Sequence, residues 1–383
     1  MHTKQENSVK YKGTDNVLSV PFILKFQGDI FMGKFLKYMP RLSSTQIIAC
    51  TFLALIFVGT LLLMLPMASA SGESLSLINA LFTATSASCV TGLVVVDTGT
   101  YFSTFGQIII LALIQLGGLG IMTFATMFSV AIGKKINLQD RLRIQESLNQ
   151  DEIDGVVKLC LRVIKYTFVI EGFLGTILAI YFYTLFGAKG IYMGYWHAVS
   201  AFCNAGFDIL GGFRSFTMFK GDWVVNIVIT TAIILGALGF AVMEDIVHKR
   251  NFSELRLHSK VVIITSLVLI VFGTGLFWLM EADNGATIAN LPISEKFLTS
   301  YFQSVSPRTA GMNTLPLDKM RDSSLFLTII LMFIGGSPAS TAGGIKTTTF
   351  AVMVLSVWAL LMAKAQWYCL IEKLEKILSI KPL

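Results

Sequence analysis

Three glycines in this chain have a sequence context in which the backbone could bind a dehydrated cation. Gly92, Gly206 and Gly311 each follow a small residue, precede a bulky apolar one and have an aromatic residue ten positions earlier. Glycine can turn its carbonyl toward an axis without the steric cost of a Cβ, and rings of carbonyls replace the hydration shell of a potassium ion. The pattern therefore predicts a filter of main-chain oxygens.

Each glycine ends a three-residue motif, and we predict that the motifs together line this filter: Val90, Thr91, Gly92, Asn204, Ala205, Gly206, Thr309, Ala310 and Gly311. No acidic side chain lies within them, so cation preference has to come from carbonyls and from the negative C-terminal ends of short helices before each motif. Potassium is the expected substrate ion and sodium a second candidate. No other metal and no organic cofactor is expected.

Two aspartates lie just outside the motifs. Asp97 and Asp208 fit either mouth residues that raise the local cation concentration or plain solvated turns. Cys89 and Cys203 stand beside the glycines, where small soft side chains suit packing. The five cysteines show no paired spacing, so neither a disulfide framework nor a metal site is indicated.

A second polar stretch interrupts the last long apolar run, 324–363, which as one helix would be about 60 Å long, twice the membrane thickness. Its glycines and proline oppose a continuous helix. We predict an unwound gate below the filter, formed by Gly335, Gly336, Ser337, Pro338, Ala339, Ser340, Thr341, Ala342, Gly343 and Gly344. Deleting 337–341 should then raise flux without changing selectivity; a static kink is the alternative.

The composition predicts the elements that carry these motifs. The chain is 54% hydrophobic and only 14% charged, with a mean hydropathy of +0.70, which is typical of a polytopic membrane protein. Runs long enough to cross about 30 Å of hydrocarbon lie at 47–67, 105–132, 166–186, 223–243 and 261–280, besides 324–363. We therefore predict an all-α polytopic fold.

The glycine motifs lie between these runs in segments too short to span. The segment 75–88 would form a helix of about 20 Å, so it must dip into the membrane and return. Non-helical backbone at that depth is tolerated only in protein or beside a watery cavity, so three such loops predict one central pore. The glycines recur about every 110 residues. This interval predicts tandem helix–pore loop–helix repeats, three of a set of four.

The repeats divide the chain as follows: 1–42, a basic N-terminal segment; 43–150, the first repeat; 151–260, the second; 261–364, the third, with a broken last helix; and 365–383, a C-terminal tail. Most of the 30 lysines and arginines lie in the segments that face the same side as the N-terminus. The positive-inside rule then predicts a multi-pass cell-membrane protein with a cytoplasmic N-terminus and pore loops outside. The N-terminal segment suits either a helix on the inner leaflet or a disordered basic tail.

The net charge of +7 belongs to this membrane surface, so the lipid bilayer is the expected partner and nucleic acid is not. Three other polar residues carry structural predictions. Glu171 should face protein and make a hydrogen bond, His197 should begin the second pore helix as a structural residue, and Arg308 should pin the third loop. Gly117–Gly120 suits close helix packing.

With these motifs in order along the chain, the sequence resembles the Ktr/Trk/HKT superfamily of potassium transporters, and most closely the membrane subunit of the bacterial Ktr system. The resemblance runs from Ser43 to about Lys364 and implies four repeats around one pore, with Gly92, Gly206 and Gly311 as filter glycines. It also implies an intramembrane gate loop at Gly335–Gly344, a homodimer and a cytoplasmic nucleotide-binding regulatory ring as partners.

Two alternatives remain beside potassium uptake. A fourth filter copy at the same interval would fall past Leu383. The chain as written is therefore expected not to conduct until a fourth unit is appended, and a truncated non-conducting fragment is the second candidate. An intramembrane enzyme would need paired aspartates, a Ser-His pair or a metal set at bilayer depth, which Glu171 alone does not provide. We therefore predict that the chain is not an enzyme.

Overall fold

The computed structural model describes residues 44–120, 123, 141–142 and 156–361, which belong to one compact unit, Ser44–Leu383. The predicted N-terminal segment 1–42 and the C-terminal tail 365–383 lie outside the described residues. The described elements are helices, joined by turns and by two isolated β-bridges. The all-α prediction is confirmed.

The first group of helices surrounds a short helix with two longer ones. α2 (Ser44–Leu63) and α5 (Thr104–Gly118) both pack against α3 (Leu77–Ser88), which Ser76 caps by accepting a hydrogen bond from the Asn79 amide. The short turns η2 (Pro66–Ala68) and α4 (Thr98–Tyr101) connect them. The twelve-residue α3 is too short to span a bilayer, as its sequence predicts.

The second group repeats this arrangement with a break. α8 (Val156–Phe186) and α10 (Trp223–Leu238) pack against α9 (Ala188–Phe202), and η3 (Thr217–Phe219) lies in the loop between α9 and α10. The apolar run predicted at 223–243 is helical but broken, because the chain bends by 98° at Gly239 into α11 (Phe240–Lys249). Gly239 has a φ of 93°, which glycine adopts easily.

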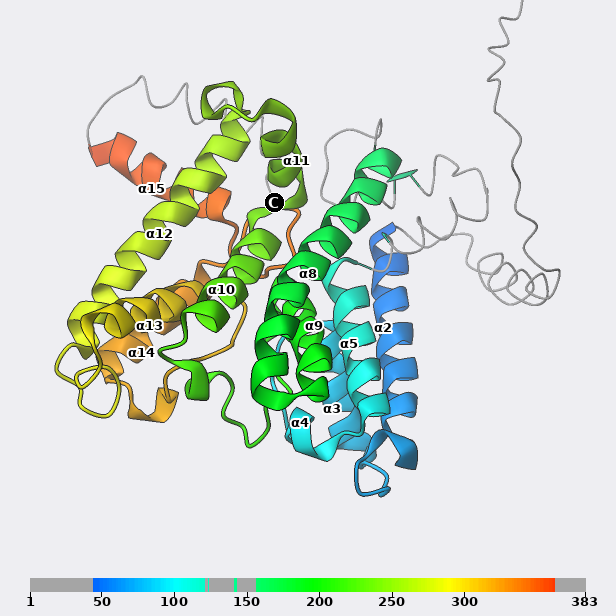
Figure 1. Ribbon diagram of the computed structural model, residues 1–383. Helices are drawn as coiled ribbons and strands as arrows, with labels where there is room; N and C mark the ends of the chain where they lie inside the picture. Colours follow the sequence, from blue (N-terminus) through cyan, green and yellow to red (C-terminus); the bar gives the residue numbers. More distant parts are fainter. Residues whose placement is uncertain (1–43, 121–122, 124–140, 143–155, 362–383) are drawn as a thin grey trace, which may run out of the picture. The chain divides into compact units, whose positions relative to one another are not determined.

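The third group contains the broken helix that the sequence predicts. α12 (Leu257–Glu281), after η4 (Phe252–Glu254), packs against α13 (Ile293–Val305), α14 (Asp322–Phe333) and α15 (Thr347–Leu361). The short turn η5 (Leu317–Lys319) precedes α14. Residues 334–346, here called the gate stretch, are non-helical and join α14 to α15 (Figure 1).

Contacts between the groups run through the short helices, since α5 packs against α9 and α10 against α13. The largest fully buried side chains include Trp196, Phe202 and Phe207, at the end of α9 and in the loop after it. Among the described residues, α2, α8 and α12 are long and apolar enough to cross a membrane, and the bent pair α10 and α11 adds a fourth span if taken together.

The run predicted at 105–132 is shorter in its described part. α5 ends at Gly118, and Gly120 takes a left-handed φ of 80°. The close packing predicted for these glycines is found: a Cβ on Gly117 would strike the Ser88 carbonyl, and one on Gly118 would lie 3.1 Å from Cys203. The end of α5 is therefore fitted against the ends of α3 and α9.

Candidate ion filter and gate

One backbone conformation recurs in the three loops that follow α3, α9 and α13. The three filter glycines (Gly92, Gly206 and Gly311) are left-handed, with φ between 74° and 82°. The residue two positions before each is left-handed as well, with φ of 56° at Val90, 55° at Asn204 and 74° at Thr309. Positive φ is uncommon outside glycine and costly for β-branched residues such as Val90 and Thr309. Its recurrence at one position of three loops shows that the three loops share one backbone geometry.

Local hydrogen bonds set this conformation in the first two loops. The Val90 and Thr91 amides donate to carbonyls of the last turn of α3, at 3.2 and 2.8 Å, and the Asn204 and Ala205 amides do the same on α9, at 3.1 and 2.9 Å. These are the bonds of a Schellman helix end, which requires a left-handed residue. In the third loop the bond to the carbonyl five residues earlier is made one motif position later: the Gly311 amide donates to the Ser306 carbonyl at 3.1 Å.

The loops lie side by side at their glycines. A Cβ on Gly92 would come within 2.6 Å of the Ala205 carbonyl oxygen, and one on Gly206 within 2.7 Å of the Ala310 carbonyl oxygen. The second loop therefore lies between the first and the third. The structure brings all nine residues predicted for the filter into one place.

Buried polar side chains of α9 make hydrogen bonds to the backbone of the second loop. Ser200 Oγ donates to the Phe207 carbonyl at 2.6 Å, and His197 Nε2 accepts from the Ile209 amide at 3.1 Å while Nδ1 faces the Met193 carbonyl at 2.7 Å. This pairing fits a neutral imidazole with its proton on Nδ1. His197 is structural, as predicted, but lies within α9, which begins at Ala188.

A second polar group contacts Cys203, at the end of α9. Gln115 Nε2 donates to both carboxylate oxygens of Glu171, at 3.1 and 3.0 Å, and Cys203 Sγ lies 3.5 Å from Gln115 Oε1. Glu171 is buried within protein, so its predicted hydrogen bond is confirmed. Cys203 packs as predicted, whereas Cys89 is exposed and lines a cavity.

Arg308 supports the third loop. Its guanidinium is buried, and Nη2 donates to Ser266 Oγ on α12 at 3.2 Å. Ser306 Oγ donates to the Met312 carbonyl, as Ser200 does to Phe207 in the second loop. Arg308 therefore pins the loop to a neighbouring helix, as predicted.

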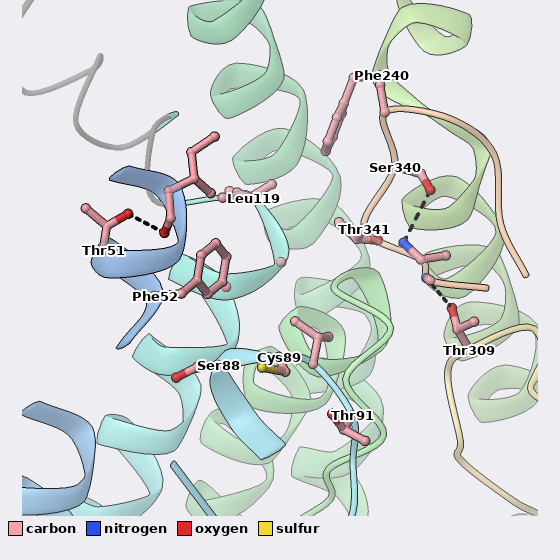
Figure 2. Close-up of a pocket in the computed structure, with 18 of the residues that line it drawn as sticks. Thr51, Phe52, Ser88, Cys89, Thr91, Leu119, Phe240, Thr309, Ser340 and Thr341 are labelled. Atoms are coloured by element: carbon pink, nitrogen blue, oxygen red, sulfur yellow. Dashed lines mark hydrogen bonds between the residues drawn. The ribbon is translucent and has the colours of Figure 1, made fainter. Parts of the chain in front are cut away.

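Residues of the first and third filter loops and of the gate stretch line one cavity of about 560 Å³. Figure 2 shows Cys89 and Thr91 on one side, and Thr309, Ser340 and Thr341 on the other. The glycine-rich end of α5 completes part of its wall. The gate stretch thus borders the same space as the filter.

The gate stretch is docked on the break in the second group. In a continuous helix the Gly236 and Ala237 carbonyls would accept bonds from the next turn; here they accept from the Thr341 amide at 3.2 Å and the Ser337 amide at 2.9 Å. The Phe240 amide donates in return to the Ala339 carbonyl at 2.8 Å. The break at Gly239 therefore supplies the backbone partners of the gate stretch.

Three further hydrogen bonds join the gate stretch to the filter loops. Thr341 Oγ1 donates to the Phe202 carbonyl at 3.0 Å and accepts from Asn204 Nδ2 at 2.8 Å. The Gly343 amide donates to Thr309 Oγ1 at 3.2 Å. The sequence treats this stretch as an obstruction separate from the filter, whereas the structure bonds the two together.

The two predicted mouth aspartates make different contacts. Asp97 Oδ1 accepts from the Thr100 amide at 2.9 Å and Oδ2 from the Phe213 amide at 2.7 Å; burial pushes its pKa up, but these bonds outweigh burial and lower the pKa. Asp208 accepts from the Leu210 amide at 3.0 Å. Burial, with the charge of Asp97 as a lesser cause, raises the pKa of Asp208 to about 6.

The chain is similar to proteins of known family. The model of a family described as cation transport protein, TrkH, matches residues 34–364. The chain belongs to this cation transport family. It is 42% identical to the Ktr system potassium uptake protein B of Bacillus subtilis over 87% of this chain and 74% of that protein. It is 41% identical to the potassium/sodium uptake protein NtpJ of Enterococcus hirae over 85% and 72%.

A solved structure of a cation transport family member has the same fold. The potassium transporter TrkH from Vibrio parahaemolyticus superposes with a TM-score of 0.60 at 18% identity, over 85% of this chain and 65% of that one. Family membership confirms the predicted resemblance, the membrane location and the prediction that this chain is a transporter and not an enzyme.

The sequence analysis missed three groups of residues that support the candidate site. The serines that clamp the second and third loops, Ser200 and Ser306, have no role in the sequence analysis, although each stands five or six residues before a filter glycine. Gln115, the partner of Glu171, was also missed. So was Gly239, whose only signal is a second glycine three residues earlier in an apolar run.

Proposed function

We propose that this chain is the pore-forming subunit of a potassium uptake system, selecting the ion with the backbone of its nine filter residues. The observation that carries the proposal is the repeated pair of left-handed residues in three adjacent loops. When alternate residues of an extended segment are left-handed, successive carbonyls turn toward the same side. Carbonyls gathered in this way replace water around a potassium ion.

The substrate follows from chemistry and from the relatives. The described ion path offers carbonyl and hydroxyl oxygens, with acidic side chains only at its mouth, which suits a monovalent cation that exchanges its hydration shell readily. Two relatives are named for potassium uptake and for potassium/sodium uptake. We assign potassium as the substrate and sodium as the second ion.

The gate is the stretch Gly335–Gly344. It borders the cavity under the filter and connects two short helices, so its displacement would widen the path that it now lines. A deletion of 337–341 should raise flux. Unchanged or lower flux in a folded protein would make the stretch a structural element.

The assembly proposed for the chain rests on its three similar helix groups. We assign these groups to three helix–pore loop–helix repeats, 43–150, 151–260 and 261–364, of a fourfold pore. The basic N-terminus lies in the cytoplasm, a second copy completes a homodimer, and a cytoplasmic nucleotide-binding ring regulates it. The family match and the short helix central to each group support this assignment.

The test measures potassium uptake in cells that lack other uptake systems. The chain is expressed as given and also extended by a fourth helix–loop–helix unit, so that either a three-loop or a four-loop filter is examined. Selective uptake is expected in the extended form. Gly206→Ser in that form should reduce it, and absence of uptake in both forms, with protein present in the membrane, would refute the proposal.

A further inference from the structure

The gate stretch is bonded to two filter loops, and we propose that Thr341 in this stretch is a positioning residue that sets the filter's preference for potassium over sodium. This inference rests on the proposed function and adds to it a second role for the gate. A gate that only obstructs would change flux alone. A gate that holds filter residues in place changes which ion they prefer.

The Thr341 hydroxyl both donates and accepts a hydrogen bond. A hydroxyl has one proton to donate, and here it goes to the Phe202 carbonyl at 3.0 Å, which leaves the oxygen to accept from Asn204 Nδ2 at 2.8 Å. Gly236 makes this possible, because a Cβ there would strike the Phe202 carbonyl and come within 2.9 Å of Thr341 Oγ1. Asn204 is buried and belongs to the second filter motif.

The same relation holds at the third loop. Gly343 of the gate stretch donates its amide to Thr309 Oγ1 at 3.2 Å. Asn204 and Thr309 occupy the same motif position, two before the filter glycine, and both are left-handed. Non-glycine residues keep such a conformation only where their surroundings over-determine it. The gate stretch supplies part of that surrounding structure.

Release of these bonds would therefore move filter carbonyls. Potassium and sodium differ in the size of site and in the number and field strength of carbonyls that they prefer, so small carbonyl shifts change the preference between them. Two backbone hydrogen bonds join the two ends of the gate stretch. The Gly335 amide donates to the Ile345 carbonyl at 3.1 Å, and the Ile345 amide donates to the Phe333 carbonyl at 3.0 Å. The stretch is therefore suited to move as one piece. Docking and undocking of one loop would then alter two filter loops together.

Linkage makes the effect reciprocal. If docking of the gate stretch favours the potassium-preferring filter, then potassium in the filter must favour docking by the same factor. Potassium should slow hydrogen exchange of the Thr341 and Gly343 amides, which are bonded only while the stretch is docked. Choline at the same ionic strength should not.

The experiment measures dissociation constants for potassium and sodium by cation-dependent thermal stabilisation, on the purified full chain as given and on the form extended by a fourth helix–loop–helix unit. Thr341→Val keeps the branched shape and removes the hydroxyl, and it should reduce the sodium-to-potassium ratio of dissociation constants about fivefold, the factor expected for one hydrogen bond. Thr341→Ser keeps the hydroxyl and should restore the ratio.

Ser340→Ala is the matched control. Ser340 Oγ bonds only within the gate stretch, to the Ser337 carbonyl at 2.7 Å and the Ala342 amide at 3.3 Å. Its loss disturbs the same stretch without touching the filter loops, so the ratio should stay unchanged. A drop as large as that of Thr341→Val would overturn the inference.

The outcomes separate this inference from the proposed function. If potassium stabilises neither the chain as given nor the form extended by a fourth helix–loop–helix unit, the proposed filter fails. If the unmodified chain prefers potassium and Thr341→Val keeps the same ratio, only the gate-to-filter inference fails. Should Thr341→Val not fold, equal exchange of the Gly343 amide of the unmodified chain in potassium and choline would still overturn it.

Discussion

The first and second filter loops have the same backbone but different support. Both end a short helix with the same pair of amide-to-carbonyl bonds and both place a left-handed residue two positions before the glycine. The second loop is buried, and its Ser200 clamps the Phe207 carbonyl. In the first loop Ser86 Oγ has no hydrogen-bond partner among the described residues, and Leu93, after the glycine, is 60% exposed.

This difference separates what a loop does by itself from what its neighbours do. The backbone turn needs only the helix end and the glycine, so it forms in both places. Side-chain support needs packed neighbours on both faces, and only the second loop lies between two others. The second loop is therefore where substitutions should affect ion selection most.

Gly206→Ser should have the largest effect. Its Cβ would lie 2.7 Å from the Ala310 carbonyl oxygen, and its φ of 74° strains any side chain. Backbone strain of about 1–3 kcal/mol is common to Gly206 and Gly311. Displacement of the Ala310 carbonyl by the added side chain occurs only at Gly206, and it should lower the potassium-to-sodium preference about tenfold. Gly311→Ala is the comparison, because its Cβ would meet nothing nearer than Gly206 Cα at 3.8 Å. Equal losses of preference in the two variants would show that crowding between loops is unimportant.

An exchange between the loops should change stability in opposite directions. Asn204→Val places a β-branched residue at a φ of 55° and removes a bond to Thr341, which should cost about 2 kcal/mol. Val90→Asn relieves the same strain in the first loop and should stabilise by about 1 kcal/mol. Thermal unfolding of the purified chain measures both. Similar losses of stability in both variants would show that the residue type at this motif position does not set its backbone strain.

The serine clamps should show a smaller contrast. Ser200→Ala removes the bond to the Phe207 carbonyl and should cost about 1 kcal/mol of unfolding free energy. Ser86→Ala removes a hydroxyl with no partner among the described residues, so its effect should stay within about 0.5 kcal/mol. Unfolding midpoints decide between these values. A larger loss of unfolding free energy for Ser86→Ala would contradict this expectation, because it would mean that the Ser86 hydroxyl makes a stabilising contact.

The mouth aspartates should give the smallest effect, as a pH dependence. The pKa of Asp97 is lowered, so it stays ionised at pH 5, whereas Asp208 with its pKa of about 6 loses its charge as pH falls from 7 to 5. One charge about 10 Å away in water alters cation affinity about twofold. Apparent potassium affinity should therefore be about twofold weaker at pH 5, and Asp208→Asn should abolish this change while Asp97→Asn keeps it.

The titration of Asp208 should affect folding stability in the opposite direction from potassium affinity. Burial raises the pKa of Asp208 above the value of 3.8 for an unperturbed aspartate, so the folded state holds this proton more tightly than the unfolded chain does. Its contribution is therefore most favourable below pH 4 and declines as pH rises to about 6. Asp208→Asn should flatten the unfolding midpoint across this window; an unchanged slope would assign it to other groups.

Much of this protein was determined by its sequence alone. Composition and run length predicted an all-α membrane fold, and the three glycine motifs predicted which loops converge, because hydrophobic length and glycine's conformational freedom act locally. The break between α14 and α15 was likewise visible, since Gly335–Gly344 contains both glycine and proline within a run too long to span once.

Only the tertiary structure decided what these elements contact. The bend at Gly239 is stabilised because amides of the gate stretch donate to the Gly236 and Ala237 carbonyls, which would accept bonds within a straight helix. No residue near Gly239 in the sequence indicates that its partner lies about a hundred positions later. The bond from Asn204 to Thr341 joins residues 137 apart in sequence. Such pairings depend on how the helix groups pack, and a hydrogen bond between distant side chains leaves no periodic pattern in the chain.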